Sequence, residues 1–131
     1  MQWIYKKKIV RQAPAGYIGF VYLVTNLVDN RIYVGKKIFR FKRKYKPQGR
    51  RKAKKVYSVE SDWKTYLGSS QELQKDISRL GKACFTKEIL RFCKTKSEMG
   101  YYEGFYMYKL KVMFKPSYNK WIVLRVRKDQ I

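Results

Sequence analysis

The segment Gly19–Lys37 constrains the fold more than any other part of the sequence, because it combines two strand-like runs with a turn. The runs are Phe20–Thr25 and Ile32–Val34, both rich in aromatic and β-branched residues. Between them lies Asn26–Arg31, which contains the asparagine and aspartate residues that favour turns. We therefore predict an antiparallel hairpin over this segment.

The register of this hairpin decides which side chains share a face of the sheet, since side chains alternate along each strand. If Tyr22 lies opposite Gly35, then Tyr22 and Tyr33 point to one face. Glycine weakens a strand, so we expect Gly35 to leave a gap beside Tyr22 that admits a phosphate and its attacking water. We also expect Glu103, on a later helix, to overlook this face.

The chain carries 32 lysine and arginine residues against nine acidic residues, a formal net charge of +23 in 131 residues. Such an excess favours a polyanionic partner, DNA or RNA, rather than a small-molecule substrate. We expect one compact domain over residues 1–131. No apolar run approaches the ~20 residues that span a membrane, and no secretory signal is recognisable, so we expect a cytoplasmic protein without membrane contacts.

Histidine is absent, and the only cysteines are Cys84 and Cys93. A closed zinc site needs about four ligands, so cysteine–histidine zinc chemistry is excluded in a single chain. The absence of histidine also excludes His-dependent nucleases and a Ser-His-Asp triad. If the protein is an enzyme, its general base must be Tyr, Lys, Glu or Asp.

Two basic segments lie on either side of the hairpin. Residues 1–16 form a basic arm that we expect to pack back on the domain as an added edge strand, through Trp3 and Tyr5. A basic insertion follows at about residues 40–58, and its Arg40–Lys55 portion holds ten basic residues and no acid. This insertion is either a solvated loop or a surface that contacts phosphates, and we favour phosphate contacts. The residues expected to bind DNA are Lys36, Arg40, Arg50, Arg51, Lys52, Lys54 and Lys55.

The remaining sequence predicts two helices and a third strand. Ser69 and Glu72 form a capping box for a helix that ends at Gly81, and a strand follows at Phe85–Cys93. A longer helix is expected over Thr95–Phe114. We therefore predict an α+β fold in which a small antiparallel three-stranded sheet, hairpin first, is flanked by helices.

Several of these segments together resemble the GIY-YIG nuclease family. Phe20-Val21-Tyr22 and Tyr33-Val34-Gly35, ten residues apart, correspond to its two tripeptides, with Gly19 one place earlier than the family's glycine. Gly68-Ser69-Ser70 and the closing Tyr118-Asn119 are similar to later parts of the family pattern. The whole set resembles small free-standing phage homing-type endonucleases, which implies the host cytoplasm as the place of action.

The resemblance implies a metal-dependent DNA endonuclease that leaves a 5′ phosphate and a 3′ hydroxyl. It implies Glu103 as the metal ligand, Tyr22 as the general base and Asn119 in a positioning role. The family's arginine corresponds to Arg43 or to Arg40. The expected catalytic residues are Tyr22, Tyr33, Lys37, Arg43, Glu103 and Asn119.

The residue types suit this chemistry. Mg²⁺ (or Mn²⁺) keeps several waters and takes phosphate oxygens, so the single carboxylate of Glu103 is sufficient to hold it. We expect Lys36, Lys37 and Arg43 to lower the pKa of Tyr22 from its ordinary value of about 10. Each role has a structural alternative, since Glu103 can instead form a surface ion pair and Tyr22 can be a core residue.

Two other functions stay open at this point. Charge alone suffices for a non-catalytic basic protein that binds nucleic acid. A structure-selective nuclease of DNA repair or recombination, acting on branched or damaged DNA, would use the same residues. The oligomeric state is also open.

Overall fold

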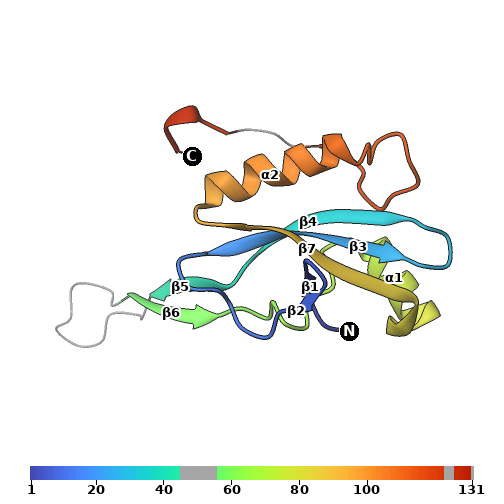
Figure 1. Cartoon of the computed structure of the whole chain (residues 1–131), viewed down its shortest axis with the longest axis horizontal. Helices are drawn as coiled ribbons and strands as arrows, with labels where there is room; N and C mark the ends of the chain where they lie inside the picture. The colour runs from blue at the N-terminus through green and yellow to red at the C-terminus, as the bar shows by residue number, and fades with distance from the viewer. Residues whose placement is uncertain (45–55, 123–125, 131) are drawn as a thin grey trace.

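The computed structural model describes residues 1–44, 56–122 and 126–130, and it shows an α+β fold (Figure 1). Its centre is a five-stranded mixed sheet with the strand order β2-β1-β7-β3-β4, and a separate two-stranded sheet pairs β5 with β6. The predicted α+β class is confirmed. The predicted three-stranded sheet is wrong, because the N-terminal arm adds two strands to the main sheet.

The hairpin consists of β3 (Gly19–Asn26) and β4 (Ile32–Ile38). On its other side β3 pairs antiparallel with β7 (Phe85–Cys93), so β3 is the central strand of these three. The N-terminal arm contributes β1 (Ile4–Tyr5), parallel to β7, and β2 (Lys8–Ile9), antiparallel to β1. The expectation that the arm adds an edge strand is confirmed, but it adds two strands, and strands of two residues are too short to show an alternating pattern in the sequence.

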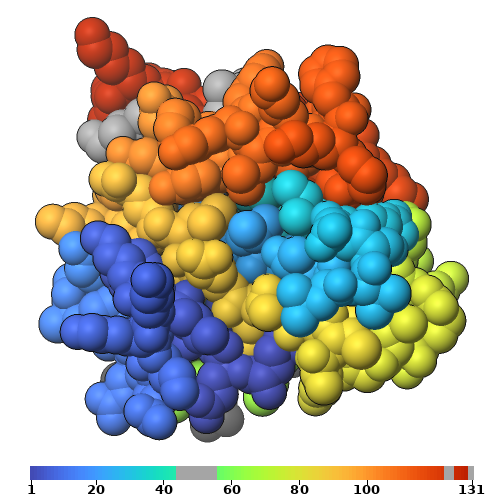
Figure 2. All heavy atoms as spheres, turned by 45° about the vertical axis from the view of Figure 1, so that its right-hand side comes forward, coloured from blue at the N-terminus to red at the C-terminus, as the bar shows by residue number. Residues whose placement is uncertain are grey.

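The helices α1 (Gln71–Leu80) and α2 (Lys96–Lys109) cover opposite faces of the sheet (Figure 1). The core on the α1 face consists of Trp3, Phe20, Tyr22, Val24, Phe39, Trp63, Leu73, Ile77, Phe85, Ile89 and Tyr118. The core on the α2 face consists of Val21, Val34, Cys93, Met99, Met107 and Val112. Successive side chains of β3 therefore enter different cores. In the space-filling view the hairpin reaches the surface between α2 and α1 (Figure 2).

Local capping sets the start of α1 one residue later than predicted. The hydroxyl of Ser70 accepts a hydrogen bond from the N–H of Leu73, so the N-cap is Ser70 and not Ser69. The predicted end is confirmed, since Gly81 follows the last helical residue, takes a positive φ of 92° and donates its N–H to the carbonyl of Ile77.

The second helix is shorter than predicted. Thr95 is its N-cap, but the helix ends at Lys109 and not at Phe114. Lys111 takes a positive φ of 53°, which an α-helix does not continue through. Within the ranges that the structure covers, no helix is long and apolar enough to cross a membrane.

The basic insertion begins and ends as a pair of strands, β5 (Arg40–Lys44) and β6 (Val56–Glu60). Short 3-10 helices occur at η1 (Lys82–Cys84) and η2 (Lys128–Gln130). Residues 45–55 lie outside the described residues. The same holds for the predicted DNA contacts of Arg50, Arg51, Lys52, Lys54 and Lys55, which stay predictions.

Lys87 is a charged residue within the sheet, and only 1% of its surface is exposed. Its ammonium group donates to the carbonyl oxygens of Lys64 (2.9 Å) and Tyr66 (3.4 Å) and lies 4.4 Å from the ring centroid of Trp3. These contacts tie the loop that precedes α1 to β7. Burial, with a smaller contribution from Lys82, lowers the pKa of Lys87 to about 8.

We predict that Lys87→Met changes the pH dependence of stability. Above about pH 8 the folded wild-type chain holds Lys87 mostly neutral, whereas the unfolded chain keeps it protonated up to its ordinary pKa of about 10.4. In this pH range the unfolded wild-type chain therefore binds more protons than the folded one. The free energy of unfolding of the wild type should then rise with pH relative to that of the variant. We expect a relative rise on the order of 1–2 kcal/mol between about pH 8 and about pH 10.

Urea unfolding of both proteins at these two pH values measures the difference. Groups that the two proteins share, such as Cys93, cancel in the comparison. A difference in the free energy of unfolding that stays constant with pH would contradict the prediction.

Candidate active site

The β3–β4 hairpin has the predicted register. Thr25 pairs with Ile32, and Tyr22 pairs with Gly35. Because side chains alternate along each strand, Tyr22 and Tyr33 point to the same face, with ring centroids 6.1 Å apart. The prediction that the two phenols share a face is confirmed.

Gly35 does not leave the predicted gap beside Tyr22. A β-carbon at Gly35 would clash with the hydroxyl and ring of Tyr22, and it would lie 3.0 Å from the ring of Tyr33. The space opposite Tyr22 is therefore filled by the phenol of Tyr22 itself. Glycine is required at this position because any side chain would displace that ring, and the expected phosphate site at this point is wrong.

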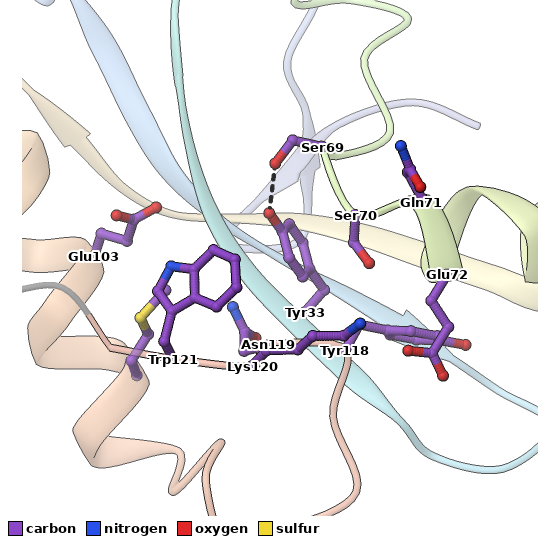
Figure 3. Close-up of a pocket in the computed structure, with 11 residues that line it drawn as sticks. Tyr33, Ser69, Ser70, Gln71, Glu72, Glu103, Tyr118, Asn119, Lys120 and Trp121 are labelled. Carbon is purple, nitrogen blue, oxygen red and sulfur yellow. Dashed lines mark hydrogen bonds between the residues drawn. The ribbon is translucent and has the colours of Figure 1, made fainter.

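A hollow of about 510 Å³ lies beside β4 instead, between the start of α1, the helix α2 and the segment that follows α2 (Figure 3). Its volume is within the range of roughly 300–1,000 Å³ that is usual for ligand pockets. The residues that line it are Tyr33, Ser69, Ser70, Gln71, Glu72, Glu103, Met107, Tyr118, Asn119, Lys120 and Trp121. Three predicted site residues thus meet here, namely Tyr33, Glu103 and Asn119.

Of the two hairpin tyrosines, Tyr33 lines this hollow and Tyr22 does not. Its hydroxyl forms a 2.8 Å hydrogen bond with the hydroxyl of Ser69, which Figure 3 marks with a dashed line. Burial raises the pKa of Tyr33, and the bond to Ser69 opposes this rise. Ser69 is available for this contact because Ser70 is the residue that caps α1.

Glu103 reaches the hollow from α2, which covers the other face of the sheet from Tyr22 and Tyr33. The expectation that Glu103 overlooks the tyrosine face is therefore correct only in part, because Glu103 and Tyr33 approach the hollow from the two sides of β4 (Figure 3). The Glu103 side chain is 18% exposed, and its Oε1 lies 3.9 Å from Nζ of Lys36. Burial raises the pKa of Glu103, and the charge of Lys36 opposes this rise.

Asn119 binds the backbone of β4. Its side-chain oxygen accepts from the N–H of Val34, and its side-chain nitrogen donates to the carbonyl of Val34, both at 2.9 Å. The neighbouring Tyr118 N–H donates to the carbonyl of Ile32 at 2.8 Å. The segment after α2 thus lies along β4, and Asn119 is bonded to the hairpin.

A polar network that sequence reasoning missed holds this segment in place. The Tyr118 hydroxyl accepts from Nδ2 of Asn26 (3.0 Å) and donates to Oδ2 of Asp76 (2.7 Å). The guanidinium of Arg31 lies 4.0 Å from the Tyr118 ring centroid and forms an ion pair with Glu72. The Tyr118 bond is the main cause of the lowered pKa of Asp76. The five residues come from three separate parts of the chain, so no local sequence signal marks them.

The predicted cations Lys36 and Lys37 lie further along β4. Lys37 forms a 2.7 Å ion pair with Asp62, and its Nζ lies 3.9 Å from the ring centroid of Tyr66. Both lysines and Tyr66 line a second hollow, of about 420 Å³. They are therefore placed beside the first hollow and not inside it.

The two candidate arginines lie on β5, and neither lines the first hollow. Arg40 donates to the hydroxyl of Ser58 (2.8 Å) and to its carbonyl (3.1 Å). The guanidinium of Arg43 lies 4.7 Å from the ring centroid of Phe41, and Phe41 lines the second hollow. Sequence spacing alone did not foresee that the chain turns into a separate two-stranded sheet at Arg40.

A comparison with protein families gives one match that covers most of the chain. The sequence model described as "Putative endonuclease segE, GIY-YIG domain" matches residues 3–122. The chain belongs to the GIY-YIG family. Searches of curated proteins and of solved structures gave no significant match.

The two tripeptides of the GIY-YIG pattern therefore lie on β3 and β4, and the predicted metal ligand lies on α2. Among the residues that the structure covers, no three Asp, Glu, Cys or His side chains gather in one place. A metal ion in this GIY-YIG site would depend on Glu103, on water and on substrate oxygens. Such a donor set consists of hard oxygen ligands and fits Mg²⁺.

Tyr22, the first-tripeptide tyrosine of this GIY-YIG chain, is 1% exposed. Burial raises its pKa well above the ordinary value, and the charges of Tyr33, Tyr66 and Glu103 raise it further. The expected lowering of this pKa by lysine and arginine is therefore wrong. Lys37 lies over the ring of Tyr66 instead, and Lys36 lies near the carboxylate of Glu103.

We predict that Gly35→Ala destabilises the domain by about 1–3 kcal/mol, because the new methyl group overpacks the ring of Tyr22. In a Tyr22→Leu background, which removes the ring, the same substitution should cost much less. Urea unfolding of the four proteins of this double-mutant cycle measures the coupling.

Gly100→Ala is the matched control. A β-carbon at Gly100 would lie 3.9 Å from Nζ of Lys36 and from a methyl group of Val126, and alanine favours a helix, so this variant should be neutral or stabilised. Equal costs of Gly35→Ala in the two backgrounds would show that the phenol of Tyr22 is not the reason for the glycine.

Proposed function

We propose that this protein is a metal-dependent DNA endonuclease that hydrolyses phosphodiester bonds and leaves a 5′ phosphate and a 3′ hydroxyl. One observation carries the proposal: a largely buried carboxylate, Glu103, lines a hollow in a chain with a net charge of +23. The positive charge favours DNA of any sequence. A carboxylate in such a surface opposes the binding of phosphate unless it holds a cation, so its position supports a metal-binding role.

Glu103 is the residue that we assign to the metal, Mg²⁺ or Mn²⁺. When bound there, the ion would neutralise the scissile phosphate and stabilise the leaving 3′ oxygen. Lys36, 3.9 Å away, favours the ionised carboxylate that a metal requires. Asn119 supports the site indirectly, because its two bonds to Val34 fix the segment that forms one wall of the hollow.

Tyr33, rather than Tyr22, is the phenol that we assign to the attacking water. Water and substrate can reach Tyr33, because it lines the hollow together with Glu103. Tyr22 is only 1% exposed. The negative charge of Glu103 raises the pKa of both phenols, and a cation held by Glu103 would oppose that effect. Tyr22 then serves to hold the ring of Tyr33 in position.

The remaining cations are assigned to the DNA backbone. Lys36 and Lys37 lie on β4, beside the first hollow. Arg40 and Arg43 lie further along the chain, on β5. Contacts of this kind fix the position of a duplex without reading its sequence. The same role is proposed for five further basic residues of the insertion, namely Arg50, Arg51, Lys52, Lys54 and Lys55.

We predict that Glu103→Gln abolishes cleavage of plasmid DNA in Mg²⁺ and leaves the affinity for DNA almost unchanged, because binding depends on positive charge and cleavage on the metal. Glu88→Gln is the control, since Glu88 is an exposed glutamate on β7 outside the hollow. Nicking assays and salt-dependent binding curves measure the two properties. Wild-type cleavage by Glu103→Gln would refute the site, and failure of the wild type to cleave would favour the non-catalytic binding protein.

We also predict that Tyr33→Phe lowers the rate of cleavage by about 10²–10⁴-fold, the usual contribution of a general acid or base, with little change in DNA affinity. Ser69→Ala removes the same 2.8 Å hydrogen bond but keeps the phenol, so it should retain most of the activity. Single-turnover rates of these variants and of Tyr22→Phe provide the measurement. A larger loss in Tyr22→Phe than in Tyr33→Phe would return the role of base to Tyr22.

A further inference from the structure

Trp121 is a large apolar side chain that the structure leaves in contact with water. It is 66% exposed, whereas the other two tryptophans, Trp3 and Trp63, are each 1% exposed. It lines the same hollow as Tyr33 and Glu103, and Figure 3 shows its indole ring next to Glu103. An exposed indole ring offers a flat apolar face that a ligand at this hollow can cover.

Exposure alone does not single out Trp121, because α2 and the turn after it carry other exposed aromatic rings. Tyr108 is 67% exposed and Phe114 is 90% exposed. Neither lines the hollow that holds Glu103. What distinguishes Trp121 is its place beside the carboxylate assigned to the metal.

The backbone just before Trp121 is bonded to the rest of the domain. Two residues before it, Asn119 makes both hydrogen bonds to the backbone of Val34. Tyr118 is 2% exposed and is bonded to Asn26 and Asp76. A segment held in this way loses less entropy when a ligand stacks on the ring that follows it, and this favours recognition.

The partner that matches this ring is a nucleobase. The chain is strongly basic, and Lys120 lines the hollow next to Trp121, so a phosphate can be held beside the ring. Every base has an aromatic face, and stacking on an exposed aromatic side chain is the common means by which proteins bind unpaired strands. Inside a duplex, both faces of a base are already covered by its neighbours.

We propose that Trp121 stacks on a base that has left the duplex next to the scissile phosphate, so that the enzyme prefers DNA with an unpaired nucleotide at the cleavage point. This inference rests on the proposed function, since it takes Glu103 as the site of the scissile phosphate. Removing a paired base from the stack costs free energy, and an unpaired base avoids most of that cost. The ring thereby distinguishes an unpaired base from a paired one, and it does not distinguish one DNA sequence from another.

The test uses two oligonucleotide duplexes that share one strand with a single 2-aminopurine, which the complementary strand pairs in one duplex and leaves unpaired in the other. Binding is measured by fluorescence anisotropy at fixed salt, in a Glu103→Gln background so that the DNA is not cut. Trp121→Ala should weaken binding of the unpaired probe by roughly 5- to 100-fold and that of the paired probe by less than about twofold. Trp121→Phe should retain most of the affinity, because a phenyl ring still stacks.

Tyr108→Ala is the matched control, because Tyr108 is equally exposed but lies outside the hollow, and it should bind both probes like the parent. The fluorescence of 2-aminopurine should also fall on binding in the parent and not in Trp121→Ala. An equal loss on both probes, or no loss on either, would overturn the role of Trp121.

Cleavage by the wild type in Mg²⁺ separates this inference from the proposed function. If the wild type cleaves DNA but Trp121→Ala treats both probes like its parent, only the stacking inference fails. If the wild type cleaves neither probe, the endonuclease function fails, and the inference falls with it.

Discussion

The hydrogen-bonded register of β3 and β4 is the constraint on which the site depends. It sets Tyr22 against Gly35, and the absence of a side chain at Gly35 lets the phenol of Tyr22 lie against the backbone of β4. That ring in turn supports Tyr33, which reaches the hollow. A slip of one residue would turn Tyr33 to the opposite face of the sheet from Tyr22. The glycine is therefore explained by packing between strands and not by an opening for substrate.

The parts of the fold that follow a local pattern could be predicted from the sequence. The hairpin, the strand Phe85–Cys93 and the glycine stop of α1 depend on neighbouring residues, and all three are present as expected. The burial of Tyr22 could not be predicted in the same way, because Trp3 and other residues distant in sequence close over it. The expected effect of lysines on its pKa was wrong for the same reason: composition gives the number of charges but not their positions.

Part of the candidate site could also be predicted from the sequence. The residues that the family pattern marks, Tyr33, Glu103 and Asn119, meet in one hollow, although they come from two sides of β4. The arginines on β5 do not join them, since the chain leaves the main sheet at that point. Trp121 has no pattern of its own, and only its exposure and place mark it. Within the hollow, Glu72 is bonded to Arg31, whereas Glu103 lies 3.9 Å from its lysine, and this difference is why we propose Glu103 and not Glu72 for the metal.

The pairing of Asn119 with Val34 also has a consequence for the behaviour of the protein in concentrated solution. β4 is an outer strand of the five-stranded sheet, and an uncovered outer strand can recruit a strand from another molecule. The amide of Asn119 occupies the N–H and C=O of Val34, as a neighbouring strand would. The opposite edge, β2, is only two residues long and begins with a lysine, a second feature that discourages recruitment. The segment that builds one wall of the hollow thus also covers part of the edge at which a strand of another molecule would pair.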